Sequence, residues 1–367
     1  MDFSEFSRTI AARMVDDGDE LESRRGSIDL SRAAQIEVDR DLYGEADSRG
    51  MTLTELLESE EYDPSGPGSA LDAFERQLAL AGIRIGGKAP TTVEQFMQQA
   101  SSLMPEFMRR EIRKGMSMRP ELSRLIANTT TVASNSYTPF YIDTENDSRF
   151  SLRPVGDGAE VPQLLVTEQN HAVKVTDYGL ALKASYKALR YRTTSQFRVL
   201  LWYVGFKLQT DKIAMLVDVA INGDGNGNPA RIIDSAASGS LTYEDLISLW
   251  AEFTPFELNT LICNVNSLKT ILAMPEFKDP LAGYRFSKTG ELFSPLGASL
   301  VRSDEVPADI VIGLDSRFAI EEVVTQPLMV EYDKIIEQRF EEAVITESVA
   351  YAKVIAAASV LLDTVHA

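Results

Sequence analysis

Residues 193–229 read TTSQFRVLLWYVGFKLQTDKIAMLVDVAINGDGNGNP, and this stretch decides the fold. Thr193 and Gln196 have the spacing of a capping box, in which the hydroxyl accepts from a free backbone amide and the glutamine reaches back. Apolar residues then recur at helical spacing from Phe197 to Ala220, until the three glycines and the proline of Asn222–Pro229 forbid continuation. At ~1.5 Å per residue the predicted helix is about 40 Å long, a length typical of a structural spine.

The segment before this helix has the pattern of an extended hairpin. Residues 148–155 can be extended, Gly156–Gly158 is a turn, and residues 164–182 are extended again, with period-2 alternation that includes Tyr178, Leu180 and Leu182. We therefore predict a long, polar β-hairpin over residues 149–180. Because an isolated two-stranded hairpin is at best marginally stable in water, its own domain or a neighbouring subunit must hold it.

The segment after the helix alternates between helix and strand. The sequence predicts helices over 242–253 and 267–274, and strands over 258–265, 298–302 and 309–313. The last segment, residues 327–365, is ambiguous, because its alanines favour helix while its valines and isoleucines favour strand. The chain as a whole is assigned to the α+β class.

The N-terminal hundred residues differ from the rest in charge and pattern. Residues 1–70 hold 18 Asp and Glu against 7 Arg, a net charge of −11 out of −19 for the whole chain. Helical patterns occur at 51–61, 71–81 and 93–114, separated by turns and linkers rich in Gly and Pro. We predict an acidic arm that contacts neighbouring subunits through its few apolar side chains. The candidates are Phe3, Phe6, Ile10, Met14, Leu53, Leu56 and Leu57.

Composition excludes several classes of protein. A net charge of −19 disfavours a nucleic-acid-binding surface, which needs clustered Lys and Arg. The chain has no N-terminal secretory pattern, and no apolar stretch approaches the ~20 residues that span a bilayer. The single cysteine, Cys263, lies in an apolar run, so we expect a buried thiol in a reducing compartment such as cytoplasm.

Motifs for catalysis and metal binding are incomplete. With His171, His366 and Cys263 as the only imidazoles and thiol, a structural zinc site or a nucleophile paired with histidine is disfavoured. Gly82–Ala89 has the spacing of a phosphate-binding loop, but it ends in Ala where Ser or Thr would bind magnesium.

Two further acidic patterns have simpler explanations. Asp224–Asn228 imitates the start of a calcium loop, whose twelfth position here is Ser235 and not a bidentate Glu. The adjacent pairs Glu321–Glu322 and Glu341–Glu342 are expected to lie on solvated faces. We therefore assign no catalytic, cofactor-binding or metal-ligating residue and expect no cofactor.

The order of these elements resembles the tailed-phage major capsid fold first described for phage Hong Kong 97, which encapsulins share. The resemblance covers roughly residues 105–363. The segments that carry it are Gly156–Pro162, Leu182–Arg190, Asp211 with Asn222–Gly225, and Tyr243–Leu246 with Leu258–Asn264. They are similar to the family's hairpin, the entry to the spine helix, the end of that helix, and the first helix and strand of the axial domain.

This resemblance implies a Hong Kong 97-type capsid fold with an N-terminal arm, an extended β-hairpin loop, a long spine helix, and peripheral and axial domains. Residues 1–110 would be the acidic arm, similar to the scaffold-like segment that many members cleave, and here expected to be retained. The peripheral domain would comprise 111–148, 183–235 and 327–367, the extended loop 149–182, and the axial domain 236–326.

The extended loop would lie over a neighbouring subunit. By resemblance, the residues assigned to this contact are Arg153, Asp157, Glu160, Gln163 and Glu168. Some members join Lys and Asn side chains covalently, but no Lys occurs here between Lys114 and Lys174. The subunit contacts are therefore expected to be non-covalent.

The function implied is that of a structural subunit and not an enzyme. Hexamers and pentamers would assemble into the icosahedral head that encloses the double-stranded DNA genome of a tailed bacteriophage, without sequence-specific DNA binding and without a membrane. Portal, scaffolding or decoration proteins would be further partners, and the virion capsid would be assembled in the bacterial host cytoplasm. Two alternatives stay open: an encapsulin-type nanocompartment shell that houses a cargo enzyme, and an acidic α/β enzyme.

Overall fold

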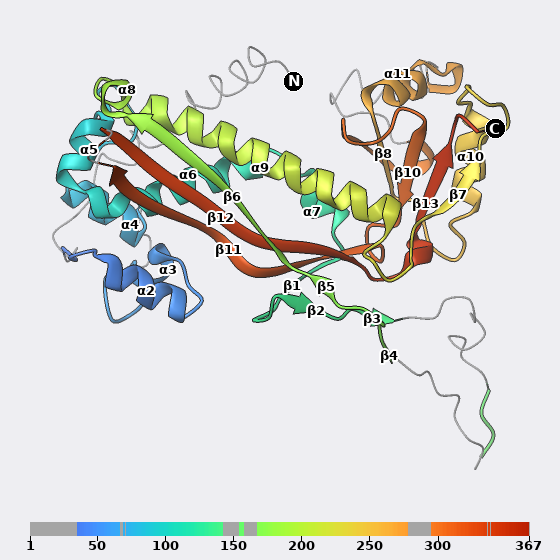
Figure 1. The fold of residues 1–367 in the computed structure, drawn as a ribbon, viewed down its shortest axis with the longest axis horizontal. Helices are drawn as coiled ribbons and strands as arrows, with labels where there is room; N and C mark the ends of the chain where they lie inside the picture. Colours follow the sequence, from blue (N-terminus) through green and yellow to red (C-terminus); the bar gives the residue numbers. More distant parts are fainter. Residues whose placement is uncertain are drawn as a thin grey trace. The chain divides into compact units, whose positions relative to one another are not determined.

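A computed structural model of the chain describes residues 35–66, 69, 71–141, 154–157, 167–277, 295–335, 337 and 339–366. The chain divides into two compact units. Unit 1 holds residues up to Met118, together with Gly179–Lys207 and Leu328–Thr346. Unit 2 holds Arg119–Tyr178, Leu208–Pro327 and Glu347–Ala367. Four elements contribute residues to both units (Figure 1): β6 (Thr176–Ser185), α9 (Thr194–Asn222), β11 (Ile320–Ile335) and β12 (Phe340–Lys353).

Helix α9 is the predicted spine helix. Its start has the predicted capping box, because the Thr193 N–H donates to Gln196 Oε1 and the Gln196 N–H donates to Thr193 Oγ1, both at 3.3 Å. Its end is set by Gly223, whose φ of 84° is a left-handed conformation that favours glycine. At ~1.5 Å per residue, 29 residues give a rod of about 43 Å. The prediction for this element is confirmed.

Short helices form the N-terminal part of unit 1. They are α2 (Arg40–Ser48), α3 (Leu53–Leu57), α4 (Ala73–Leu80), α5 (Val93–Gln99) and α6 (Met104–Ser117). Capping boxes open α3, α4 and α5, which explains why such short segments are helical.

The apolar side chains of these helices are buried within the same chain. Leu53 is 2% exposed, and Leu56 and Leu57 are fully buried. The expectation that these leucines need a neighbouring subunit is therefore wrong, because the helices of the segment cover one another. The other candidates, Phe3, Phe6, Ile10 and Met14, lie outside the described residues.

The segment 93–114, predicted as one helix, forms two helices in the structure. The pattern over 93–114 predicts a continuous helix, but the backbone leaves the helical region at Ala100, where φ is −150° and ψ is 48°. A short 3₁₀ turn at Ser101–Leu103 follows, and α6 begins with Pro105 in its first turn. Proline has no N–H to donate and is tolerated in the first turn of a helix, so Pro105 marks a new helix start. Apolar periodicity does not register this signal, and for that reason the prediction missed the break.

Helices α6 and α9 meet at two glycines in unit 1. A Cβ atom on Gly205 would overlap the carbonyl oxygen of Ile112, and one on Gly115 would overlap that of Trp202. Close approach also brings Glu111 of α6 to Arg198 and Trp202 of α9. Its Oε2 accepts from Arg198 Nε at 2.9 Å and from Trp202 Nε1 at 2.6 Å. Glycine at both positions is therefore a packing requirement.

Unit 2 contains a five-stranded sheet in the order β7-β13-β10-β8-β9. Its strands are β7 (Arg231–Asp234), β8 (Thr260–Cys263), β9 (Ser299–Arg302), β10 (Ile310–Leu314) and β13 (Ser359–Asp363), and the helices α10 (Tyr243–Ala251) and α11 (Val265–Ala273) belong to the same unit. The predictions of alternating helix and strand over 242–313 are confirmed, with bounds shifted by one to two residues. Their sheet partner β13 comes from the ambiguous C-terminal segment.

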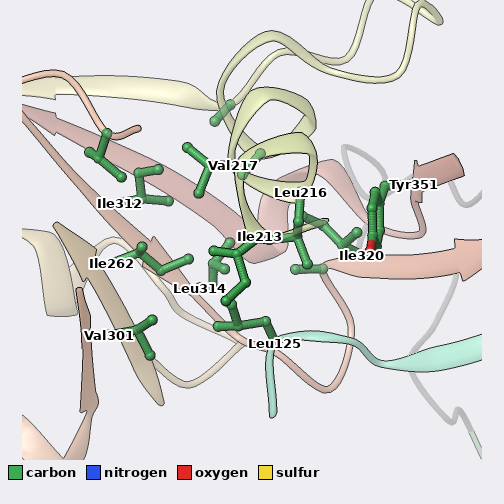
Figure 2. Close-up of a cluster of buried hydrophobic side chains, with 14 of the residues drawn as sticks. Leu125, Ile213, Leu216, Val217, Ile262, Val301, Ile312, Leu314, Ile320 and Tyr351 are labelled. Carbon is green, nitrogen blue, oxygen red and sulfur yellow. The ribbon is translucent and has the colours of Figure 1, made fainter. Parts of the chain in front are cut away.

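A buried cluster joins this sheet to the second half of α9 (Figure 2). Leu216 of α9 and Leu314 of β10 are fully buried, and Ile213 is 1% exposed. Helix α7 (Glu121–Leu125) adds Leu125, and β11 adds Ile320, to the same cluster. At ~1.5–3 kcal/mol for each fully buried aliphatic side chain, this cluster is a main source of stability in unit 2.

A four-stranded sheet has the order β1-β11-β12-β6, with β1 at Asn128–Thr131. Strands β11 and β12 resolve most of the ambiguous segment 327–365, while Ala356–Ala358 forms a 3₁₀ turn. Strand β1 pairs only with residues 321–324 of β11. Pro327 therefore lies beyond β1, where a residue without an N–H is tolerated in a strand.

Candidate assembly surfaces

A two-stranded ribbon belongs to unit 2 and precedes α9 in the chain. Strand β2 (Ser136–Tyr137) pairs with β5 (Val173–Lys174), and β3 (Phe140–Tyr141) pairs with β4 (Thr167–Glu168), both antiparallel. We call the described residues of this segment, 136–141, 154–157 and 167–174, the ribbon. It begins before the predicted start at residue 149. The sequence pattern does not show this start, because each strand there is only two residues long and Pro139 lies between them. Of the extended segment predicted over 164–182, the part from Thr176 on is β6, which pairs with β12 in the four-stranded sheet, so the predicted hairpin is wrong for this part.

The inner end of the ribbon is anchored in unit 2. Val173 and the following Val175 are 8% and 4% exposed and pack in one cluster with Val323 of β11 and Ala352 of β12. Tyr137 packs against the same cluster. The anchor is small, so it fixes where the ribbon leaves the unit without covering its outer part.

The outer described part of the ribbon is exposed. Phe140 is 63% exposed and lies opposite Glu168, which is also exposed. Val155 is 43% exposed, and Asp157 in the same described segment is exposed. Arg153, Glu160 and Gln163 lie outside the described residues. The structure thus places Asp157 and Glu168 on the surface, and the contact role of all five residues stays a prediction.

The glycine-rich turn after α9 fixes the ribbon and the end of β12. Gly223, Gly225 and Gly227 have φ values of 84°, 93° and 69°. The Asn226 side-chain oxygen accepts from the His171 N–H at 2.9 Å, and Asp224 Oδ2 accepts from the Lys353 N–H at 2.9 Å. Sequence reasoning identified this turn as a helix stop but missed its contacts, since neither partner is near in sequence.

The Asp224 carboxylate is occupied by backbone amides. Besides the Lys353 amide, it accepts from the Asn226 N–H at 3.2 Å. Across the described part of the chain, no group of three or more His, Cys, Asp or Glu side chains is placed to hold a metal ion. The turn is a backbone device in this structure, and its indifference to calcium stays a prediction.

A buried ion network ties α9 to the sheet in unit 2. Lys212 Nζ lies 2.8 Å from Glu322 Oε1 of β11 and 2.8 Å from Glu347 Oε1 of β12. Tyr351 donates its hydroxyl to Glu322 at 3.1 Å. Burial acts to lower the pKa of Lys212, but the Glu347 and Glu322 carboxylates outweigh burial and raise it. The network holds the ammonium charged.

This network corrects one prediction. Glu321 and Glu322 are 7% and 8% exposed and are not on a solvated face. In a strand, adjacent side chains point to opposite faces, and here both faces are covered. Burial raises the pKa of Glu321, whose carboxylate is near the hydroxyls of Tyr137 and Thr130. Glu341 and Glu342 are likewise only half-exposed.

Strand β6 is an edge strand with an unusual exposure. Among the described strands it has a hydrogen-bonded neighbour, β12, on one side only. Most of its ten residues are exposed, including Tyr178 and Leu180 at 43% each. A long edge strand with free backbone groups and exposed apolar side chains is a template for pairing with another chain. It is a second candidate contact surface.

Two buried reactive groups have no access to solvent. Cys263 is fully buried in β8, and burial raises the pKa of its thiol to about 12, which confirms the predicted buried thiol. Lys353 is 1% exposed, and its ammonium contacts Ser359 Oγ at 3.1 Å. Burial lowers the pKa of Lys353 to about 8, while Asp224 opposes that shift.

Within the described residues, no helix is long and apolar enough to cross a membrane. No protein-family model matches the sequence, and no curated protein matches it.

Solved structures similar to this chain include three shells. The capsid of a native GTA particle has a TM-score of 0.49 and 15% identity, covering 66% of this chain and 89% of that one. The capsid of the cyanophage P-SCSP1u has a TM-score of 0.47 and 11% identity, covering 67% of this chain and 88% of that one. The holo-SrpI encapsulin from Synechococcus elongatus has a TM-score of 0.47 and 14% identity, covering 67% of this chain and 88% of that one. These similarities describe a likeness of fold.

Proposed function

We propose that this chain is the structural subunit of an icosahedral capsid, the head that encloses the double-stranded DNA genome of a tailed bacteriophage. It acts by self-assembly and catalyses no reaction. Hexamers and pentamers of the subunit build the shell in the cytoplasm of the bacterial host. Portal, scaffolding and decoration proteins are the further partners of such a shell.

The observation that carries the proposal is the ribbon. It is anchored at one end by Val173 and Val175, while its outer part exposes Phe140 at 63%. A two-stranded ribbon has too little apolar area to be stable alone. A neighbouring subunit that covers Phe140 and Val155 supplies the missing surface, and obligate interfaces of this kind bury ~2,000–5,000 Å².

The charge of the chain supports enclosure of DNA without adhesion. The net charge of −19 repels phosphate, and at physiological salt that repulsion acts over ~8 Å. A wall of this sign lets packaged DNA slide along it. Sequence-specific DNA binding is not part of the proposal.

The proposed division of labour follows the domains expected from the resemblance. Residues 149–182 form the loop over the neighbour, with Arg153, Asp157, Glu160, Gln163 and Glu168 in the contact. Residues 236–326 form the axial domain at the centres of hexamers and pentamers. The peripheral domain, residues 111–148, 183–235 and 327–367, contains the spine helix, and the acidic arm, residues 1–110, is retained.

Negative-stain microscopy of the purified full-length chain tests the proposal. We expect large, thin-walled icosahedral shells. Small closed shells with internal density would instead indicate a cargo compartment, and monodisperse small particles would contradict shell formation altogether.

A ribbon deletion tests the observation that carries the proposal. Removing Asp157–Gln169 should leave a soluble, folded subunit, because the described anchor at Val173 and Val175 is kept, but it should abolish shells. Normal shells from this variant would contradict the role of the ribbon.

A further inference from the structure

The longest stretch of the chain without Asp or Glu is Tyr178–Thr210. Its six cations are Lys183, Lys187, Arg190, Arg192, Arg198 and Lys207. In a chain of net charge −19 this segment has the opposite sign from its surroundings. Subunits that all carry −19 repel one another, so a local site of positive charge is where an attractive contact is expected.

Four of these cations lie together in unit 1 around α8 (Tyr186–Leu189), between β6 and α9 (Figure 1). Lys183, Lys187, Arg190 and Arg192 are all exposed, and Tyr191 between the two arginines is 80% exposed. We call residues 183–192 the basic strip.

Much of the charge of the basic strip is unneutralised. Within the described part of the chain, the side chains of Lys187 and Arg192 form no ion pair. Arg190 Nε lies 3.4 Å from Glu94 Oε1, in a pair that is largely exposed to water. Such exposed pairs exchange easily for a partner of higher charge density.

A pocket of about 220 Å³ opens beside the basic strip in unit 1. Its apolar lining comes from Met97, Leu189 and the ring of Tyr186, and Arg190 and Lys334 add positive charge. Glu94 and Glu341 also line it, so cations and anions are balanced at the pocket itself. The pocket suits an apolar side chain, while the exposed cations of the strip suit carboxylates around it.

The chain contains a segment with this chemistry. Residues 16–22 read DDGDELE, with five carboxylates and a single aliphatic side chain, Leu21. We propose that the basic strip of one subunit binds Asp16–Glu22 of a second copy, with Leu21 in the pocket and the carboxylates on Lys187, Arg190 and Arg192. This inference rests on the proposed function, because it names the contact through which neighbouring shell subunits are joined.

Charge complementarity favours this occupant over DNA. Glu94 and Glu341 lie beside the strip and oppose a continuous phosphate backbone, whereas a short acidic peptide places its charges on the strip alone. Every copy also brings its own acidic run, so the partner is present at the concentration of the site. The contact is predicted to weaken with salt, because exposed charges are screened.

A charge-swap series in the full-length chain tests the contact. The strip reversal is Lys187→Glu with Arg192→Glu, and the run reversal is Asp17→Lys with Asp19→Lys. Each should lower the fraction of protein in shells about tenfold, since like charges placed together are repulsive, and the four substitutions combined should restore it to within about twofold. The matched control, Arg124→Glu with Lys269→Glu, makes the same charge change at exposed positions elsewhere and should assemble normally. Melting temperatures establish that each variant is folded.

Zero-length carbodiimide coupling tests this contact independently of shell formation, and therefore independently of the proposed function. In a mixture of light and ¹⁵N-labelled wild-type subunits, coupling should join Lys187 of one label to a carboxylate of residues 16–22 of the other, even in oligomers short of a shell. Coupled peptides of a single label only would contradict a contact between copies.

Three other outcomes would overturn the inference. They are normal shells from the strip reversal, failure of the combined variant to recover, and retention of a DNA duplex on filters by wild type that the strip reversal abolishes. Absence of any wild-type shell would instead refute the proposed function, leaving the coupling result to decide on the contact.

Discussion

The second half of α9 and the ribbon both belong to unit 2, but α9 buries its apolar side chains there and the outer ribbon exposes them. Ile213 and Leu216 of α9 are buried at 1% and 0% exposure, and Lys212 finds two carboxylates inside the unit. The ribbon buries Val173 at its base and leaves Phe140 63% exposed further out. One region buries its side chains within a single chain, and the other leaves them exposed, where we propose that a second surface covers them.

This difference predicts two kinds of mutant. Substitutions around α9 should change the free energy of unfolding of the isolated subunit. Substitutions in the outer ribbon should leave that free energy unchanged and alter assembly.

Gly205→Ala should have the largest effect. The added methyl group meets the backbone of Ile112 and Met116, which cannot move away as a side chain would. We expect a loss of about 3 kcal/mol or more in the free energy of unfolding, measured by urea denaturation.

Gly44→Ala is the matched control for this substitution. Gly44 is also helical, in α2, but nothing lies within 4 Å of the position that its added methyl group would occupy. This variant should gain about 0.5–1 kcal/mol from helix propensity. Equal losses in both variants would show that the close contact of α6 and α9 does not limit stability.

Lys212→Met should cost about 3 kcal/mol at neutral pH, because two buried carboxylates lose their shared cation. Urea denaturation of the isolated subunit at pH 7 measures this loss, and a free energy of unfolding equal to that of wild type would contradict the network's role.

Lys353→Met should stabilise the subunit. Burial lowers the folded-state pKa of Lys353 to about 8 from 10.5, so below pH 8 the folded state carries the cost of a buried charge. That cost corresponds to about 3 kcal/mol at most. Between pH 8 and 10.5 the unfolded state binds more protons, so wild-type stability rises with pH, and in the variant this rise should be absent. Identical pH profiles for the two proteins would refute the lowered pKa.

The elements that the sequence predicts well carry two independent local signals. Helix α9 has both apolar periodicity and a capping box at Thr193, and its bounds are predicted almost to the residue. Helix α10 has a capping box at Thr242 in the same way. Over 93–114 the capping box at Thr92 marks where the helix starts, but the apolar periodicity runs on past its end, and the break at Ala100 is missed.

What sequence could not predict depends on distant partners. Glu322 is buried because Lys212 and Tyr351, far away in the chain, approach it from another helix and another strand. The start of the ribbon at Ser136 and the use of Asn226 to hold His171 are of the same kind. Of the predicted contact residues, Asp157 and Glu168 could be placed, and they are exposed.

The most direct test measures two quantities for one double variant: the free energy of unfolding of the isolated subunit and the fraction of protein in shells. Phe140→Ser with Val155→Ser removes two large apolar side chains that are exposed in the described part of the ribbon. The unfolding free energy of the isolated subunit should stay within about 0.5 kcal/mol of wild type, since neither side chain is buried there. Sedimentation velocity should show the fraction of protein in shells falling at least about tenfold, because each side chain lost from an interface weakens every repeat of that contact. Wild-type shell formation by this variant, or loss of shells only together with loss of folding, would contradict the claim that the ribbon is completed by a neighbouring subunit.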